Sequence, residues 1–135
     1  MVVVSTDVSR LDIDTVHRWL STDAYWAIGR ARDVVERAVA GSLNFGAYVD
    51  DRQVGYARVV TDRATFAWLC DVYVDPDARG SGVGTALVGA VDAALTDLKV
   101  ERTVLATGDA HGLYAKFGFE PMPQPERWML RTSLP

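Results

Sequence analysis

The chain has little cysteine and little histidine: Cys70 is its single cysteine, and His17 and His111 are its two histidines. One cysteine excludes a disulfide within the chain, and this set offers no plausible structural zinc cluster, so we expect no metal. Long apolar runs are also absent, and the opening Met1–Val4 is too short for the hydrophobic region of a signal peptide. The sequence therefore predicts a cytoplasmic protein that does not enter a membrane.

An excess of positive charge is absent as well. The chain has 14 Lys and Arg residues against 18 Asp and Glu residues, which gives a net charge of −4, and the basic residues are scattered. A protein that follows nucleic-acid phosphates needs a broad basic surface, so we expect no nucleic-acid partner. What is present, 49% apolar and 24% charged residues, is typical of a globular protein. We expect a single domain over residues 1–135.

The first 41 residues predict a short strand and two helices. The strand covers residues 2–5. Asp12 or a neighbour can cap a helix whose apolar residues recur at helical spacing, namely Ile13, Val16, Trp19 and Leu20. A second helix spans residues 31–40, with Gly41 where a glycine commonly ends a helix. Tyr25 and Trp26 lie between the two helices.

From residue 43 the apolar residues alternate with a period of two, which predicts antiparallel strands over 43–49, 54–60 and 65–74 joined by short turns. In the third strand this alternation gives two faces. One face carries Phe66, Trp68, Cys70, Val72 and Val74, and the other carries Ala67, Leu69, Asp71 and Tyr73. Asp71 is the one charged residue among them.

The rest of the chain predicts a right-handed crossover and a parallel strand pair. A helix over residues 84–98 precedes a strand over 103–106. A short helix follows, capped by Thr107 or Asp109 and ended by Gly118. A last strand near residues 128–131 closes the sheet.

Three glycines, Gly80, Gly82 and Gly84, stand where the third strand leads into the long helix. Glycines let the backbone approach a ligand closely, and the first N–H groups of a helix have no internal partner, so this loop predicts a phosphate site. Two common phosphate motifs do not fit. A P-loop needs a lysine before its Ser or Thr, and a dinucleotide loop needs a third glycine in G-x-G-x-x-G.

What fits is Arg79-x-x-Gly82-x-Gly84, which follows Val72-Tyr73-Val74-Asp75-Pro76 and resembles the coenzyme A loop of the GNAT superfamily of N-acetyltransferases. Later in the chain, Leu113-Tyr114-Ala115-Lys116-Phe117-Gly118-Phe119 resembles the second motif of that family. The resemblance covers essentially the whole chain. It implies the α+β GNAT fold, a three-layer α/β arrangement with a mixed, mostly antiparallel sheet of six to seven strands and about four helices.

The resemblance implies acetyl-CoA as cosubstrate, with its pyrophosphate on the backbone of the loop: Arg79, Gly80, Ser81, Gly82, Val83 and Gly84. It places the pantetheine arm along the main chain of Val72, Tyr73 and Val74, where the strands of the family splay apart and a backbone amide can stabilise an oxyanion. Thr107 stands where many relatives carry an asparagine that contacts the cofactor. Its hydroxyl can replace that contact in part.

Tyr114 is the candidate general acid by resemblance, because its motif position lies beside the cofactor sulfur and a phenol is protonated at neutral pH. Alternatively, Tyr114 is an aromatic residue of the helix that only packs in the core. Asp71, His111 and Asp109 are the candidates for the base, although Asp109 is most economically a helix N-cap. Asp71 can instead form a structural pair with an arginine such as Arg58, and His111 can be structural. Tyr25, Trp26 and Tyr56 could line the acceptor pocket or simply pack.

Together these features predict an N-acetyltransferase in which a primary amine of a small molecule attacks acetyl-CoA directly in a ternary complex. One alternative is an acyl-CoA-binding sensor or interaction domain without turnover, and another is acetylation of a protein or peptide amine. The net charge of −4 disfavours aminoacyl-tRNA as the acceptor. The sequence leaves the oligomeric state open, with a homodimer among the alternatives.

Overall fold

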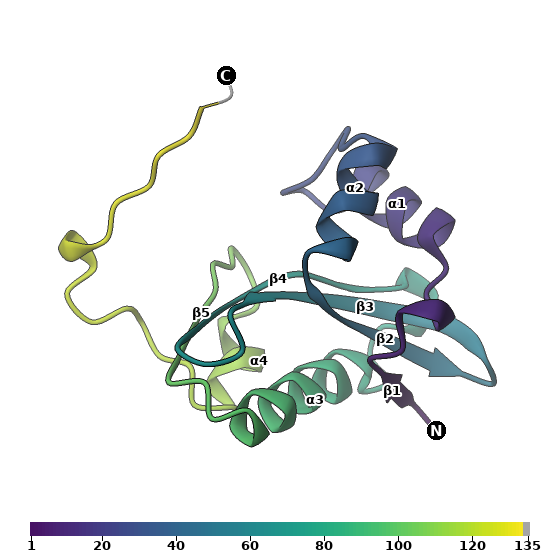
Figure 1. Cartoon of the computed structure of the whole chain (residues 1–135). Coiled ribbons are helices and arrows are strands. Elements are labelled where there is room, and N and C mark those ends of the chain that lie inside the picture. Colours follow the sequence, from purple (N-terminus) through teal and green to yellow (C-terminus); the bar gives the residue numbers. More distant parts are fainter. Residues whose placement is uncertain (134–135) are drawn as a thin grey trace.

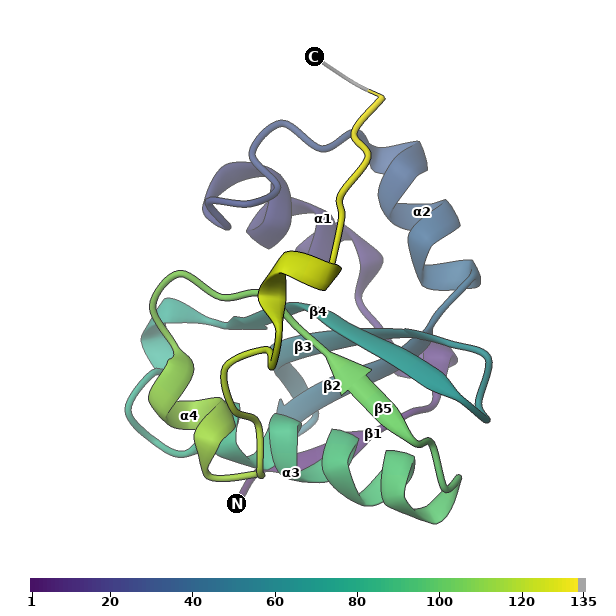
Figure 2. The same ribbon diagram turned by 90° about the vertical axis from the view of Figure 1, so that its left-hand side faces the viewer.

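The computed structural model describes residues 1–133, which form three layers with a β-sheet in the middle (Figures 1 and 2). The strands follow one another in the sheet in chain order: β1 (Val3–Ser5), β2 (Leu43–Val49), β3 (Arg52–Thr61), β4 (Phe66–Val74) and β5 (Arg102–Val104). β1 to β4 are antiparallel, and β5 runs parallel to β4. The helices are α1 (Ile13–Thr22), α2 (Arg32–Ala40), α3 (Val83–Asp97) and α4 (His111–Ala115).

The α1 and α2 layer covers one end of the sheet on one face (Figure 1). Asp12 caps α1, because its carboxylate accepts a hydrogen bond from the backbone N of Thr15 at 3.1 Å. α2 ends at Gly41, as predicted. The apolar faces of the two helices pack on two tyrosines of the sheet in one buried cluster, whose helical members include Val16, Trp19, Leu20, Val35 and Val39 and whose sheet members are Tyr56 and Tyr73.

α3 lies on the opposite face and occupies almost the range predicted for it. Its buried stripe of Val83, Leu87, Val88, Val91 and Leu95 packs against β2, β3 and β4 in the larger core cluster. Gly55 of β3 permits this contact, since a Cβ there would lie 2.9 Å from Leu87 Cδ1. Among the helices of residues 1–133, neither α3 nor any other has the length and apolar character to cross a bilayer.

A bulge in β4 overturns the faces predicted for that strand. The pairing with β3 shifts between Tyr56 and Arg58, so β4 has one more residue than β3 at this point. Asp71 lies at this bulge, and its φ of 51° is in the left-handed region. The side chains of Val72 and Val74 therefore pack in the α3 cluster with Ala67 and Leu69, whereas Tyr73 packs beneath α1 and α2.

The sheet of residues 1–133 has five strands, so the prediction of six to seven strands is wrong, whereas four helices are present. The difference lies at the C-terminal end, where residues 128–131 form no strand and stand away from the body (Figure 1). The preceding Pro121, Pro123 and Pro125 account for this. Proline donates no backbone N–H and holds the chain extended, so the segment does not turn back onto β5.

Candidate functional site

β4 and β5 run side by side only over a short stretch. Their pairing starts at Phe66 and ends at Trp68, which lies opposite Val104. β4 continues to Val74, and over that second half it has no ladder partner on the β5 side among residues 1–133. The free backbone groups there can bond an extended ligand in the way that an added strand would.

The glycine loop, residues 79–84, leads from β4 into α3. Gly80 and Gly82 have φ values of 82° and 88°, which residues with a Cβ rarely adopt. A Cβ on either would meet no atom within 4 Å, so the loop backbone is open on that side. Gly82 is the N-cap of α3 and supplies no side-chain cap. The first N–H groups of α3 therefore favour an anion at this end of the helix.

Arg79 points back toward β4 from the start of this loop. Its Nε donates to the carbonyl oxygen of Val74 at 3.0 Å, and its Nη2 lies 3.4 Å from Asp23 Oδ2. The guanidinium also lies over the ring of Tyr73, 5.3 Å from the centroid. Tyr73 donates its hydroxyl hydrogen to Asp23, and burial together with this bond raises the pKa of Tyr73 to about 12. Arg79 thus covers the end of β4 next to the loop.

The carboxylate of Asp71, 4% exposed at the bulge, accepts three hydrogen bonds. Oδ1 accepts from Nε1 of Trp26 at 2.8 Å. Oδ2 accepts from Nη1 of Arg30 and from Nε of Arg58, both at 2.8 Å. Arg58 also donates to Oγ of Ser42 at 3.0 Å. The carboxylate therefore joins β4 to β3 and to the segment between α1 and α2.

These partners decide the protonation of Asp71. Burial alone would raise the pKa of this carboxyl, because burial disfavours the charged form. The hydrogen bond and charge of Arg58, followed by the bond from Trp26 and the charge of Arg30, outweigh burial and hold the pKa of Asp71 below its usual value. Asp71 is ionised at neutral pH and is a weak proton acceptor. The structural pair with Arg58, which the sequence leaves as an alternative, is present.

Tyr25 and Trp26 connect this network to the loop that precedes α4. Their rings make a T-shaped contact with centroids 4.9 Å apart. Trp26 bonds to Asp71, and the hydroxyl oxygen of Tyr25 accepts from the backbone N of Gly108 at 2.9 Å. A Cβ at position 108 would lie 3.0 Å from that oxygen, so glycine permits the approach. Two segments far apart in the sequence are thereby fixed to each other.

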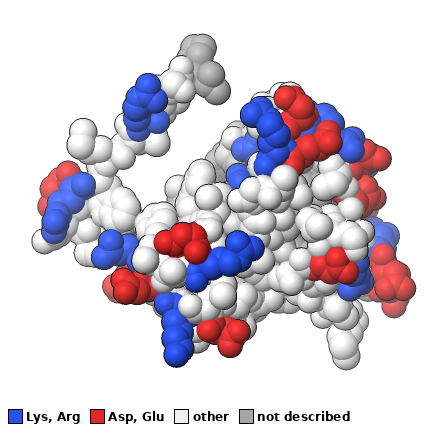
Figure 3. All heavy atoms as spheres, in the orientation of Figure 1, with Lys and Arg blue, Asp and Glu red and all other residues white. Residues whose placement is uncertain are grey.

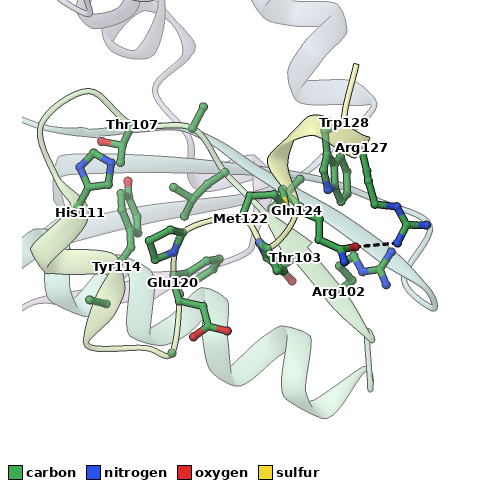
Figure 4. A pocket seen from close by; sticks show the side chains of 18 residues that line it. Arg102, Thr103, Thr107, His111, Tyr114, Glu120, Met122, Gln124, Arg127 and Trp128 are labelled. Atoms are coloured by element: carbon green, nitrogen blue, oxygen red, sulfur yellow. Dashed lines mark hydrogen bonds between the residues drawn. The ribbon is translucent and has the colours of Figure 1, made fainter. Parts of the chain in front are cut away.

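A cavity of about 900 Å³ opens between β5, α4 and the chain that follows α4. Three of the predicted site residues line it together: Thr107, His111 and Tyr114. Figure 4 shows these three side chains at the same end of the cavity, with the Tyr114 hydroxyl directed toward Thr107 and His111. The remaining walls come from residues 102–106 and from residues between 118 and 128.

Tyr114 is the most buried of the three, with 8% of its surface exposed and its ring packed edge-on against Phe119. Burial raises the pKa of Tyr114 to about 12, and Asp109 and Tyr25 add to the shift. The phenol is therefore protonated at neutral pH and can act as a proton donor. His111 is exposed one turn earlier on α4.

Thr107 already makes a local bond, since its Oγ1 accepts from the backbone N of Ala110 at 3.1 Å. Of the two caps predicted for the short helix, Thr107 is the one that bonds the backbone, although α4 itself starts only at His111. The N-cap position is Ala110, which offers no side-chain cap. Gly118, with a φ of 88°, follows the helix as predicted.

The structure separates the predicted site residues into three adjoining places. The loop and residues 72–74 lie at the free edge of β4, the group with Tyr114 lines the cavity, and Asp71 lies in its own network outside that cavity. Sequence reasoning missed Arg30, because it lies between two helices with no periodic pattern around it. One signal for such a partner was available: a buried carboxylate such as Asp71 needs cationic partners.

Two further residues can be assigned from burial. Tyr56, considered for the acceptor pocket, is 1% exposed and donates to Asn44 in the core. Burial raises the pKa of Cys70 to about 11, which keeps its thiol unreactive. Among residues 1–133 no cluster of three or more His, Cys, Asp and Glu side chains could hold a metal. The face drawn in Figure 3 carries interspersed acidic and basic side chains.

The chain matches one family model and is similar in sequence to known proteins. The model described as the acetyltransferase (GNAT) domain matches residues 40–121. A protein of Gibberella zeae that is provisionally named an acetyltransferase is 31% identical over 84% of this chain and 76% of its own length.

Solved structures agree with these matches. A GNAT-family protein of Xanthomonas campestris pv. campestris is 50% identical, with a TM-score of 0.93 over 98% of this chain and 93% of that one. This match extends past residue 121, where the family model ends. A Mycobacterium tuberculosis protein in complex with CoA is 23% identical, with a TM-score of 0.71 over 90% of this chain and 73% of that one. At that identity the likeness concerns the fold alone.

Proposed function

The chain belongs to the GNAT acetyltransferase family, and we propose that it transfers an acetyl group from acetyl-CoA to a primary amine of a small molecule. The observation that carries the proposal is the free edge of β4 beside the uncapped N-terminus of α3. An extended amide chain that ends in phosphates matches both features at once. The Mycobacterium tuberculosis structure supports the assignment, because a protein of the same fold binds CoA.

The glycine loop holds the pyrophosphate in this proposal. The anion binds to the backbone N–H groups of the loop at the start of α3, and the dipole of α3 adds to the attraction. Residues 72–74 bond the amides of the pantetheine arm through their main chain. Arg79 has to release the carbonyl oxygen of Val74 for this, and its half-exposed guanidinium is then available to the phosphates.

Acetyl-CoA supplies a thioester as the electrophile. The amine nitrogen forms a bond to the acetyl carbon while the bond from carbon to sulfur breaks, and a backbone N–H of residues 72–74 stabilises the developing oxyanion. Tyr114 donates its phenolic proton to the departing sulfur. The proton lost by nitrogen passes to His111, directly or through water, and both residues recover their starting state by exchange with solvent.

Asp71 has a different role in this proposal. With three donors on its carboxylate and a lowered pKa, it holds Trp26 and Arg30 in place and does not take the proton of the amine. Trp26 and Tyr25, on the segment between α1 and α2, then line the acceptor side. Asp71 is therefore a positioning residue, and His111 is the base that remains.

The experiment measures CoA release from acetyl-CoA with a panel of aliphatic diamines, amino acids, amino sugars and lysine peptides. A thiol-reactive dye reports the product, and the Cys70→Ser variant removes the protein's own thiol. We expect turnover with at least one small amine. Tyr114→Phe should lower kcat at least 100-fold while calorimetry shows unchanged CoA affinity.

Three outcomes would argue against the proposal. CoA binding without turnover of any amine would favour a sensor or interaction domain. Turnover of peptide lysines alone would assign the activity to protein acetylation. An unchanged kcat in Tyr114→Phe, measured where chemistry is rate-limiting, would remove the general-acid role.

A further inference from the structure

Given the acetyl transfer proposed above, on which this inference rests, we propose that the acceptor is an amine with a carboxylate and an apolar side chain, as in an apolar amino acid. Arg30 and Arg58 bind the carboxylate of the acceptor. The two arginines belong to the buried network around Asp71, which has more positive than negative charge.

Two guanidinium groups share one carboxylate in this network. Arg30 Nη1 and Arg58 Nε both lie 2.8 Å from Oδ2 of Asp71, and neither arginine forms an ion pair with any other acidic residue of 1–133. The two arginine side chains are 23% and 12% exposed, so water screens their charge only in part. One positive charge of the network is thus left without a counter-charge. Such a charge is costly to bury, and a bound anion would offset the cost.

Both guanidinium groups keep N–H donors for that anion. Arg58 uses Nε for Asp71 and Nη1 for Ser42, and its Nη2 has no partner among residues 1–133. Arg30 uses Nη1 alone, so its Nε and Nη2 have no partner in the same part of the chain. A guanidinium binds a carboxylate well, because its planar N–H groups can form paired hydrogen bonds to the two oxygens.

Asp71 does not bind the ammonium group of the acceptor in this arrangement. Its carboxylate is 4% exposed and already accepts hydrogen bonds from Trp26, Arg30 and Arg58. Its function is to hold the two guanidinium groups side by side. The charged group that the protein recognises on the acceptor is therefore the anion, while the amine is the part that reacts.

The arginines lie near the place where β4 parts from β5. Arg58 of β3 is paired with Cys70 of β4. The pairing of β4 with β5 ends at Trp68, which is two residues before Cys70, or roughly 7 Å along the strand. The free edge of β4, where the pantetheine arm binds in the proposed function, starts beyond that point. A carboxylate on the arginines would thus leave the amine of the same small molecule close to the thioester.

Exposed apolar side chains adjoin the arginines on the same face of the sheet. Trp68 is paired with Val60, two residues along from the pair of Arg58 and Cys70, so all four side chains share one face. Trp68 and Val60 are 45% and 38% exposed, because α1 and α2 cover only the other end of this face (Figure 1). Trp26, which bonds to Asp71, is 42% exposed. An apolar side chain of the acceptor would cover these groups.

The charge of the network favours a carboxylate over a phosphate. A carboxylate has a single negative charge, which balances the one positive charge that lacks a counter-charge. A phosphate monoester has close to two negative charges at neutral pH. Its second charge would lie beside the half-buried network without a partner. We therefore expect the protein to prefer β-alanine to O-phosphoethanolamine.

The first test measures kcat/KM for matched acids and amides: L-phenylalanine with L-phenylalaninamide, and L-leucine with L-leucinamide. The amide has the less basic amine, so a preference for the acid cannot arise from the amine. We expect the acid to be preferred at least about tenfold, as for other hydrogen bonds between charged groups.

Variants of Arg30 test the source of this preference. Arg30→Gln should lower the ratio of acid to amide at least about tenfold, and Arg30→Lys should retain part of it. A general loss of activity cancels in the ratio, because it affects both substrates. Arg37→Gln, on the exposed side of α2, removes the same charge and is the matched control, for which we expect an unchanged ratio.

The second test needs no turnover. Calorimetry of the CoA-loaded protein compares N-acetyl-L-phenylalanine with N-acetyl-L-phenylalaninamide, and we expect the acid to bind at least about tenfold more tightly. If no amine is acetylated, the acetyl transfer is wrong, and this comparison still decides whether a carboxylate site exists. Equal values for acid and amide, a ratio that Arg30→Gln leaves unchanged, or a preference for O-phosphoethanolamine over β-alanine would each overturn the carboxylate site and leave the acetyl transfer in place.

Discussion

The indole nitrogen of Trp26 donates a 2.8 Å hydrogen bond to the buried carboxylate of Asp71 in the bulge of β4. Arg30, four residues further on, bonds the other oxygen of the same carboxylate. The segment between α1 and α2 is therefore held by a charge inside the sheet and not by apolar packing alone. Because that segment also carries Tyr25, the network reaches the loop in front of α4.

Asp71→Asn should lower the free energy of unfolding by about 3 kcal/mol at pH 7, because it leaves Arg30 and Arg58 without their buried counter-charge. Urea denaturation followed by circular dichroism measures the difference. Asp92→Asn on the exposed face of α3 is the control and should stay within about 0.5 kcal/mol of the unmodified protein. Equal stabilities of the two variants would contradict the prediction.

The pH dependence of this difference has a defined sign. The pKa of Asp71 is lower in the folded state than the ordinary aspartate value of 3.8, so the stabilisation is fully present above that value. It is lost as the pH falls through the folded-state pKa. The gap between the unmodified protein and Asp71→Asn should be constant from neutral pH down to about 5 and should shrink at pH 3. A gap of the same size at pH 3 and pH 7 would show that the charge is not its source.

Periodicity alone predicted the helices and the first four strands of this chain to within two residues at most ends, because each element has a local apolar pattern and a capping residue or glycine at its end. The bulge could not be predicted this way. An aspartate with positive φ leaves no mark in the alternation of its neighbours, and the bulge transferred Val72 and Val74 to the other face.

The missing last strand has a physical reason that was visible in the sequence. Residues 128–131 have the composition of a strand, but strand composition does not decide whether a partner edge is within reach. Pro121, Pro123 and Pro125 were the relevant signal. At the site, the motif residues of the loop and of α4 were predictable, whereas Arg30 depends on a tertiary contact with Asp71.

Tyr25→Phe should weaken catalysis without changing the affinity of the protein for CoA. The change removes the acceptor of the Gly108 N–H and so loosens the segment between α1 and α2, which lines the acceptor side in the proposal. A lost hydrogen bond of this kind costs about 1 kcal/mol, so we expect kcat/KM for the amine to fall by up to about tenfold. Steady-state kinetics and calorimetry measure the two quantities.

Tyr48→Phe is the matched control for that experiment. The Tyr48 hydroxyl is buried and has no hydrogen-bond partner in the described part of the chain, so its removal should leave stability equal or slightly higher. A similar loss of kcat/KM in both variants, or a loss of CoA affinity in Tyr25→Phe, would contradict the proposed role of Tyr25.

Gly82→Ala tests the loop. The residue has a φ of 88°, and a side chain in the left-handed region costs about 1–2 kcal/mol. Relief of that strain turns the N–H groups at the start of α3 away from the anion, so we expect CoA affinity to fall at least tenfold in calorimetry. Gly89→Ala is the control inside α3, where a Cβ would make an ordinary 3.6 Å contact with Phe117. It should bind CoA normally and gain about 0.5–1 kcal/mol of stability.

Tyr114 gives a prediction at alkaline pH. Its pKa of about 12 in the folded protein lies above the ordinary tyrosine value of 10.0, so the folded state holds this proton more tightly than the unfolded state. The stabilisation is fully present below pH 10 and is lost as the pH rises through 12. The unfolding free energy of the unmodified protein, compared with Tyr114→Phe, should therefore decline between about pH 10 and pH 12. Tyr56 and Tyr73 also have raised pKa values, but they are present in both proteins, so the difference isolates Tyr114.

The same proton of Tyr114 has to remain in place for catalysis, so kcat should show no alkaline fall caused by Tyr114 below about pH 11. A fall of kcat near pH 9 that Tyr114→Phe abolishes, or a stability difference that is the same at pH 8 and pH 11, would show that this phenol is not the buried acid described here.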